Sequence, residues 1–155
     1  MSSNNPPGDA AAAAEAGWRA MYQLVFEREG QSRMFAAAEA HGVTPAAVKM
    51  LLALGEGDPP AMRELAERFR CDPSYVTTLV DGVEQAGWGE RRPHPADRRV
   101  KVVAMTDAGR AAHAEVRKVL DTPPAWFSVL SPEELEQLKA LLTKLQAAQA
   151  AEDAG

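Results

Sequence analysis

Apolar residues recur at helical spacing in the middle of the chain. Residues Met62, Leu65, Ala66 and Phe69 follow the i, i+3, i+4, i+7 pattern of a helix with one buried face. The same spacing returns a few residues later in a second set: Val76, Leu79, Val80 and Val83. The pattern predicts two short amphipathic helices separated by a tight turn.

The second helix has recognisable ends and an outer face of short polar side chains. Asp72 suits the N-cap position, Pro73 the first helical position and Gly87 the residue after the helix. With the apolar stripe turned inward, the outward residues are Ser74, Thr77, Thr78 and Asp81, with Tyr75 at the edge. A helix with such a face can enter a groove of DNA.

A β-hairpin with a basic tip is predicted after this helix. The turn residues His94-Pro95-Ala96 are followed by Asp97 and by a partly β-branched run over residues 98–103. From Trp88 to Lys101 there are two acidic residues and five basic ones, namely Arg91, Arg92, Arg98, Arg99 and Lys101. Helix, turn, helix and basic hairpin predict a winged helix-turn-helix that binds double-stranded DNA.

Further helices are predicted on both sides of this region. An N-terminal stripe contains Trp18, Met21, Tyr22 and Val25, with Phe26 beside it, and Thr44-Pro45 starts another helix. Thr106 caps a helix after the hairpin. Ser131 and Glu134 form a capping box before a seam of leucines, namely Leu135, Leu138, Leu142 and Leu145. Such apolar helices at both ends need a partner surface, so we expect a homodimer.

These patterns give a domain plan. We expect residues 1–9 to be a disordered leader, 10–57 N-terminal dimerisation and scaffold helices, 58–106 the winged helix-turn-helix core and 107–155 C-terminal dimerisation helices, all within one intertwined domain. The expected fold class is mainly α with a small β-wing.

The hairpin also resembles a known family. Asp97-Arg98-Arg99, five further residues and then Met105-Thr106-Asp107-Ala108-Gly109 resemble the wing motif of the MarR (multiple antibiotic resistance) regulators, with Met105 in place of leucine. The resemblance implies a homodimeric regulator, usually a repressor, that binds a near-palindromic operator and responds to a small ligand between the dimer helices and the DNA reader. Two features depart from the family pattern: Thr78 replaces a frequent basic residue, and Trp88-Gly89 replaces a small apolar pair.

Site residues follow from these patterns. We expect Ser74, Tyr75, Thr77 and Thr78 to contact bases in the major groove and Arg99 to enter the minor groove. Arg98 is expected on phosphate, Asp97 is expected to hold the wing turn, and Arg91 and Lys101 complete the basic surface. For the aromatic residues Trp18, Tyr22 and Phe26 we favour plain core packing, and the alternative is a ligand pocket formed by Trp18, Tyr22, Phe26 and His113.

Composition limits other functions. The net charge is −5, yet the 61–110 region has nine basic and eight acidic residues, so the acidity lies elsewhere in the chain. A single cysteine, Cys71, excludes an internal disulfide; it is either a buried filler of the turn or a redox sensor. The three histidines lack metal-ligand spacing, so we expect no metal and no cofactor.

The remaining expectations concern location and alternative functions. No apolar run approaches the ~20 residues of a membrane span and the start is polar, so we expect a cytoplasmic protein. No nucleophile with a base and no phosphate loop is evident, so we expect no enzyme. The alternative function is a winged-helix module that binds protein and does not read DNA, which Thr78 and the overall acidity favour.

Overall fold

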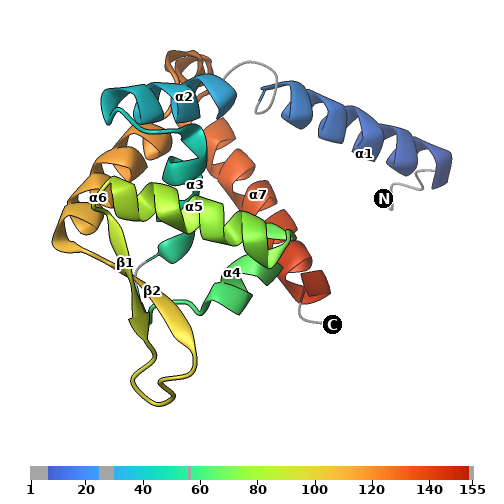
Figure 1. The fold of residues 1–155 in the computed structure, drawn as a ribbon. Coiled ribbons are helices and arrows are strands. Elements are labelled where there is room, and N and C mark those ends of the chain that lie inside the picture. Colours follow the sequence, from blue (N-terminus) through green and yellow to red (C-terminus); the bar gives the residue numbers. More distant parts are fainter. Residues whose placement is uncertain (1–6, 25–29, 56, 154–155) are drawn as a thin grey trace. The chain divides into compact units, whose positions relative to one another are not determined.

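The computed structural model describes residues 7–24, 30–55 and 57–153, and is mainly helical with one two-stranded antiparallel sheet (Figure 1). The predicted fold class is therefore confirmed. The chain forms two compact units, Met1–Asp121 and Thr122–Gly155. No helix in the described part is both long enough and apolar enough to cross a lipid bilayer.

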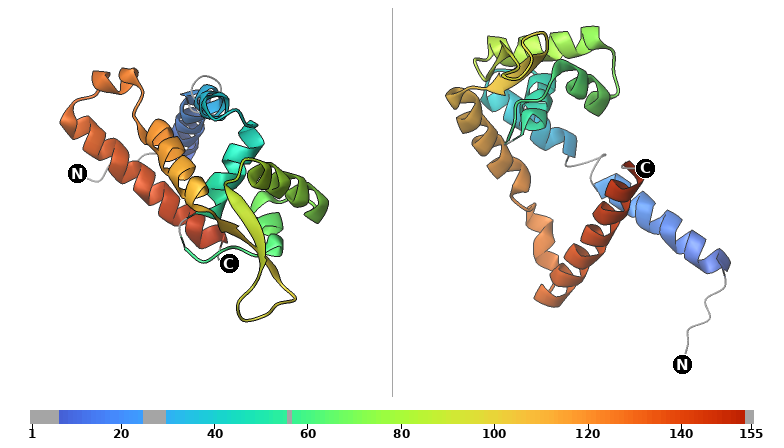
Figure 2. Two further views of the ribbon diagram at one scale, coloured as in Figure 1. Left: turned by 60° about the vertical axis from the view of Figure 1, so that its left-hand side comes forward. Right: turned by 90° about the horizontal axis from the view of Figure 1, so that it is seen from below.

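The first unit contains the predicted helix-turn-helix and hairpin. Its elements are α1 (Pro7–Tyr22), α2 (Gly30–Ala40), α3 (Pro45–Leu54), α4 (Met62–Phe69), α5 (Pro73–Gln85), β1 (Gly89–Pro93), β2 (Lys101–Met105) and α6 (Asp107–Asp121). The second unit contains a 3-10 helix, η2 (Ala125–Val129), and α7 (Pro132–Asp153). In the first unit the loop between β1 and β2 projects beyond α3, α5 and α6 (Figure 2).

The core of the first unit is built on the apolar stripe of α5. Its four predicted residues are all buried, and they pack with Leu65 of α4 and with Val48, Met50 and Leu51 of α3. Because the inner side of α5 is so closely packed, its polar side is held outward in a fixed rotation about the helix axis. This packing exposes the face of α5 that the sequence assigns to DNA.

Side-chain caps fix the starts of α3 and α6. The hydroxyl of Thr44 accepts a hydrogen bond from the backbone N–H of Ala47 at 3.2 Å. Thr106 Oγ1 accepts from Gly109 N at 3.0 Å and donates to the carbonyl oxygen of Gly87 at 2.6 Å. Thr106 therefore joins the start of α6 to the end of α5. Asp72 is the N-cap of α5 as predicted, but its side chain forms no capping hydrogen bond, contrary to our expectation.

Glycines allow α5, α6 and β1 to approach one another closely. A Cβ atom added to Gly109 would lie only 1.8 Å from the backbone oxygen of Trp88, and one added to Gly89 would lie 2.9 Å from Cγ1 of Val83. Trp88 itself is buried, and its ring meets that of His41 edge-on with centroids 5.4 Å apart. The unusual Trp88-Gly89 pair thus combines one large side chain with one missing side chain in the same part of the core.

The hairpin pairs in a single register, and it differs from the prediction at its second strand. Gly89 lies opposite Met105, and Pro93 lies opposite Lys101. Strand β2 begins at Lys101, whereas the β-branched pattern places Arg98 and Arg99 in the strand. Residues 98–100 instead form the turn. A single bridge between Ala61 and Val102 ties the sheet to the start of α4.

The helix-turn-helix connection contains the chain's one described non-glycine residue with a positive φ. Arg70 has φ 49°, ψ 47°, and its N–H bonds to the carbonyl of Glu67 at 3.1 Å. Cys71 follows, with its N–H bonded to the carbonyl of Ala66 at 3.1 Å. The cysteine is half-buried and packs against the core.

The second unit has the predicted capping box at its helix start. Ser131 N donates to Glu134 Oε2 at 2.8 Å, and Glu134 N donates to Ser131 Oγ at 3.3 Å. Hydrogen bonds from the backbone and from the Ser131 hydroxyl lower the pKa of Glu133 below its ordinary value. Several leucines of α7 are exposed in the single chain, most of all Leu141 (62%) and Leu145 (59%). The helix therefore presents apolar side chains that the chain itself does not cover.

Two expected boundaries differ from the structure. Helix α1 begins at Pro7, inside the predicted leader; residues 1–6 lie outside the described part. Helix α6 contacts α2, α3 and β2 within the first unit, whereas the domain plan groups it with the C-terminal helices. Its buried residues Gly109, Ala112 and Val116 explain the difference, because they complete the core around α3 and β2.

Candidate nucleic-acid interface

The first turns of α5 present four exposed polar or aromatic side chains. Ser74, Tyr75, Thr77 and Thr78 are all exposed, and Tyr75 retains 53% of its accessible surface. Ser74, Thr77 and Thr78 lie on the side of α5 away from its buried stripe, and Tyr75 lies at the edge of that stripe. The structure therefore brings together the residues that the sequence assigns to base contacts, in the first two turns of one helix.

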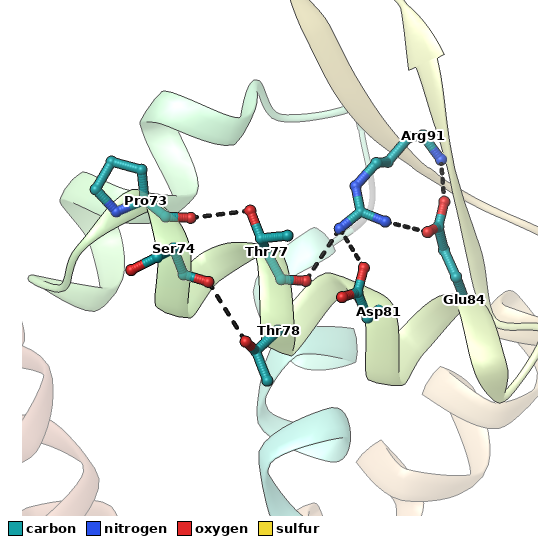
Figure 3. A network of polar contacts seen from close by, with 7 residues as sticks. All are labelled: Pro73, Ser74, Thr77, Thr78, Asp81, Glu84 and Arg91. Atoms are coloured by element: carbon teal, nitrogen blue, oxygen red, sulfur yellow. Dashed lines mark hydrogen bonds and ion pairs between the residues drawn. The ribbon is translucent and has the colours of Figure 1, made fainter.

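The two threonine hydroxyls donate to the helix backbone. Thr77 Oγ1 lies 3.0 Å from the carbonyl oxygen of Pro73, and Thr78 Oγ1 lies 3.4 Å from that of Ser74 (Figure 3). With its hydrogen used in this way, each hydroxyl offers lone pairs and each side chain offers a methyl group. Such a surface can accept a hydrogen bond from the amino group of adenine or cytosine and can pack on a thymine methyl.

The wing tip is a hydrogen-bonded turn that exposes two guanidinium groups. The carboxylate of Asp97 accepts a hydrogen bond from Arg99 N at 3.0 Å, and the backbone carbonyl of Asp97 accepts one from Val100 N at 3.0 Å. Across the hairpin, His94 N donates a hydrogen bond to Val100 O at 2.8 Å. Arg98 and Arg99 are both exposed, and neither forms an ion pair within the described residues. Their charges are thus available to an anionic partner such as a DNA backbone.

Lys101 and Arg91, the other two predicted DNA contacts, differ in their surroundings. Lys101 is exposed at the start of β2. Arg91 is half-buried, and its guanidinium points to α5, where Nη2 lies 2.7 Å from Asp81 Oδ1 and 3.0 Å from Thr77 O, while Nη1 pairs with Glu84 (Figure 3). The expectation that Arg91 contacts DNA therefore lacks geometric support. Its partner Glu84 was not among the predicted site residues.

A pocket of about 310 Å³ lies beside the hairpin and contains His113. Among the described residues, its polar side chains are Arg92, Arg110 and His113, and its apolar residues include Leu54, Val103 and Met105. The size falls at the lower end of the range for small-molecule pockets. Its two arginines each pair with a carboxylate outside the lining, Arg92 with Glu90 and Arg110 with Asp107.

The predicted aromatic residues are not part of this pocket. Trp18 and Tyr22 are exposed on α1, with ring centroids 6.3 Å apart. Phe26 lies outside the described residues. Among those that the structure describes, no three metal-type side chains converge.

Comparison with known proteins agrees with this geometry. The family model described as "MarR family" matches residues 43–101, which span α3, the helix-turn-helix and the wing up to Lys101. The HTH-type transcriptional repressor MdtR of Bacillus subtilis (strain 168) is 36% identical over 133 residues, which cover 84% of this chain and 83% of MdtR.

Solved structures give the same result. The YusO protein from Bacillus subtilis is similar with a TM-score of 0.62 and 29% identity, over 93% of this chain and 99% of YusO. CouR from Rhodococcus jostii RHA1, solved bound to p-coumaroyl-CoA, is similar with a TM-score of 0.57 and 25% identity, over 79% of this chain and 88% of CouR. The helix-turn-helix, the basic wing and these relatives together show that the chain belongs to the MarR family of transcriptional regulators.

Proposed function

We propose that this MarR-family regulator is a homodimer that represses transcription by binding a near-palindromic operator. Helix α5 enters the major groove and the wing enters the flanking minor groove. The observation that carries the proposal is an exposed face of short polar side chains on α5 together with two exposed guanidinium groups at the wing tip, which form no ion pair with any described residue. In a dimer, two such readers are separated by about 34 Å, which is one turn of DNA.

Dimerisation is supported by the apolar side chains that the single chain leaves uncovered. The exposed leucines of α7 and the exposed Trp18 and Tyr22 of α1 are large apolar groups that a second copy can bury. We accordingly assign the dimer interface to the helices at both ends of the chain, and the DNA reader to residues 58–106. Repression is proposed by analogy with MdtR, which is named a repressor.

Control by a small ligand is the other part of the proposal. CouR is known with p-coumaroyl-CoA bound, and the pocket beside His113 offers two arginines and a histidine over an apolar floor. We propose that a small anionic molecule binds this pocket and lowers the affinity for the operator. A ligand that binds the DNA-free form more tightly shifts the equilibrium by its difference in affinity between the two forms.

A gel-shift titration tests the proposal. The full chain is incubated with labelled fragments of the region that flanks its own gene, in the presence of excess unrelated DNA. A discrete shifted band that survives the competitor supports an operator-binding regulator. If no fragment is retained at low salt while the protein is folded and dimeric, the alternative function as a protein-interaction module is favoured instead.

A further inference from the structure

Arg91 joins the wing to the recognition helix through several polar contacts. Besides the guanidinium contacts to Asp81, Glu84 and the carbonyl of Thr77, its backbone N–H donates to Glu84 Oε1 at 2.8 Å. The side chain of Arg91 retains 26% of its accessible surface, and the side chains of Asp81 and Glu84 retain 50% and 33%. The network is thus partly shielded from solvent, where ion pairs are screened less than at a free surface.

The spacing of its partners along α5 lets Arg91 fix the orientation of β1 relative to that helix. Residues 77, 81 and 84 lie four and then three positions apart, so they share one stripe along two turns of α5. A guanidinium is planar and presents its donors in a rigid fork. Contacts at three positions along the helix axis therefore fix both the rotation of α5 and the angle between α5 and β1. A single ion pair would not fix both.

The same contacts also reduce the negative charge on the surface of α5. Asp81 and Glu84 place two carboxylates on the helix that approaches a polyanion, and the single positive charge of Arg91 offsets one of their two negative charges within the protein. Three of the five N–H groups of Arg91 bind α5 and its side chain is half-buried, so it is less available to a phosphate than the exposed Arg98 and Arg99. The neighbouring Arg92 differs, since its guanidinium pairs with Glu90 at 3.0 Å and lines the pocket instead.

We propose that Arg91 is a positioning residue that makes the wing and the recognition helix bind DNA as one rigid unit, without contacting DNA itself. The proposal rests on the proposed function, because it assigns a role within the same DNA-reading site. It implies that the contribution of the wing guanidinium Arg99 depends on Arg91, even though the two side chains lie at opposite ends of the hairpin arm.

A double-mutant cycle tests this coupling. Dissociation constants are measured by fluorescence anisotropy on one high-affinity duplex, at several salt concentrations, for the full-length protein and for Arg91→Ala, Arg99→Ala and the double variant. We expect Arg91→Ala to weaken binding by roughly tenfold or more. Arg99→Ala should have a smaller effect in the Arg91→Ala background than alone.

Two further variants serve as matched controls. Arg92→Ala removes a guanidinium from the next residue of the same strand and should combine additively with Arg99→Ala. Glu84→Gln keeps Arg91 and removes only one of its ionic partners, so it is the gentler change if Arg91→Ala fails to fold. It should show coupling to Arg99→Ala of the same sign.

The outcomes separate this inference from the proposed function. Additive effects of Arg91→Ala (or of Glu84→Gln, if that variant is used) with Arg99→Ala would overturn the positioning role. A parent protein that binds no duplex refutes the proposed function, whereas a parent that binds with an additive cycle refutes only the role of Arg91.

Discussion

At the level of single residues, the close approach of Gly109 to Trp88 determines where α6 starts. A methyl group at Gly109 would overlap a backbone oxygen, which cannot rotate away as a flexible side chain could. The helix, its Thr106 cap and the end of α5 therefore depend on the absence of a side chain at this position. The family motif places a glycine here, and the structure supplies a steric reason for it.

Gly109→Ala should lower the free energy of unfolding by at least about 1–3 kcal/mol, the usual cost of overpacking a core. Gly17→Ala is the matched control, because Gly17 is also helical but a Cβ there would meet no atom within 4 Å. That change should stabilise the protein by up to about 1 kcal/mol through helix propensity. Denaturant titrations at one fixed protein concentration measure both, and equal stability of the two variants would contradict the steric account.

The bonded threonine hydroxyls lead to a prediction on sequence preference. Thr77→Val keeps the methyl group but removes the lone pairs, whereas Thr77→Ser keeps the hydroxyl but removes the methyl group. If Thr77 acts as an acceptor, valine should relax the preference for an amino-bearing base, adenine or cytosine, and serine should retain it. Selection from a random duplex pool compares the variants, and an unchanged preferred sequence for Thr77→Val would refute base readout by Thr77.

At the scale of secondary-structure elements, the local sequence predicts contacts made within one helix but not contacts made between elements. The stripe on α5 was predictable because helical spacing alone places Val76, Val80 and Val83 on one side. The left-handed conformation of Arg70 had no signal, since glycine or asparagine is the usual residue there. Contacts of Arg91 with Glu84 and Asp81 depend on how a strand folds back on a helix, which no periodicity encodes.

The predicted role of Asp97 in the wing turn rests on a different local structure from the one that the sequence suggested. Alternation along a strand suggested that Asp97 and Arg99 lie on one side, yet both belong to the region before β2 begins. Their association comes instead from the hydrogen bond between Arg99 N and the Asp97 carboxylate. Turn geometry of this kind is common for Asp, whose short side chain bonds to the backbone two residues ahead.

Substitutions at the wing tip should separate two kinds of DNA contact. Arg98→Ala should weaken binding to all sequences alike and lower the salt slope by about 0.9. Arg99→Ala should chiefly reduce the preference for A·T-rich flanks, whose narrow minor groove attracts guanidinium, and Arg99→Lys should not restore it because an ammonium is more strongly hydrated. Salt titrations on A·T-rich and G·C-rich flanks distinguish them; identical behaviour of both alanine variants would mean that the wing only clamps phosphate.

For the entire chain, we expect the exposed leucines of α7 to decide the oligomeric state. Leu141 and Leu145 are the most exposed of them in the single chain, so glutamate at these positions disturbs little within the protomer. Leu141→Glu combined with Leu145→Glu should produce monomers and weaken operator binding, while Lys144→Glu should leave the dimer intact. Sedimentation at micromolar concentration measures this, and a stable dimer of the double variant would place the interface elsewhere.

The central claim is that two copies of α5 and of the wing read one duplex together. Hydroxyl-radical footprinting on the best duplex from a random pool tests it most directly. The account predicts two protected regions related by approximate two-fold symmetry, with centres about 10 base pairs or a multiple of this apart. It also predicts minor-groove protection on the flanks that disappears with Arg99→Ala. A single asymmetric footprint, or protection of the flanks that Arg99→Ala leaves unchanged, would contradict it.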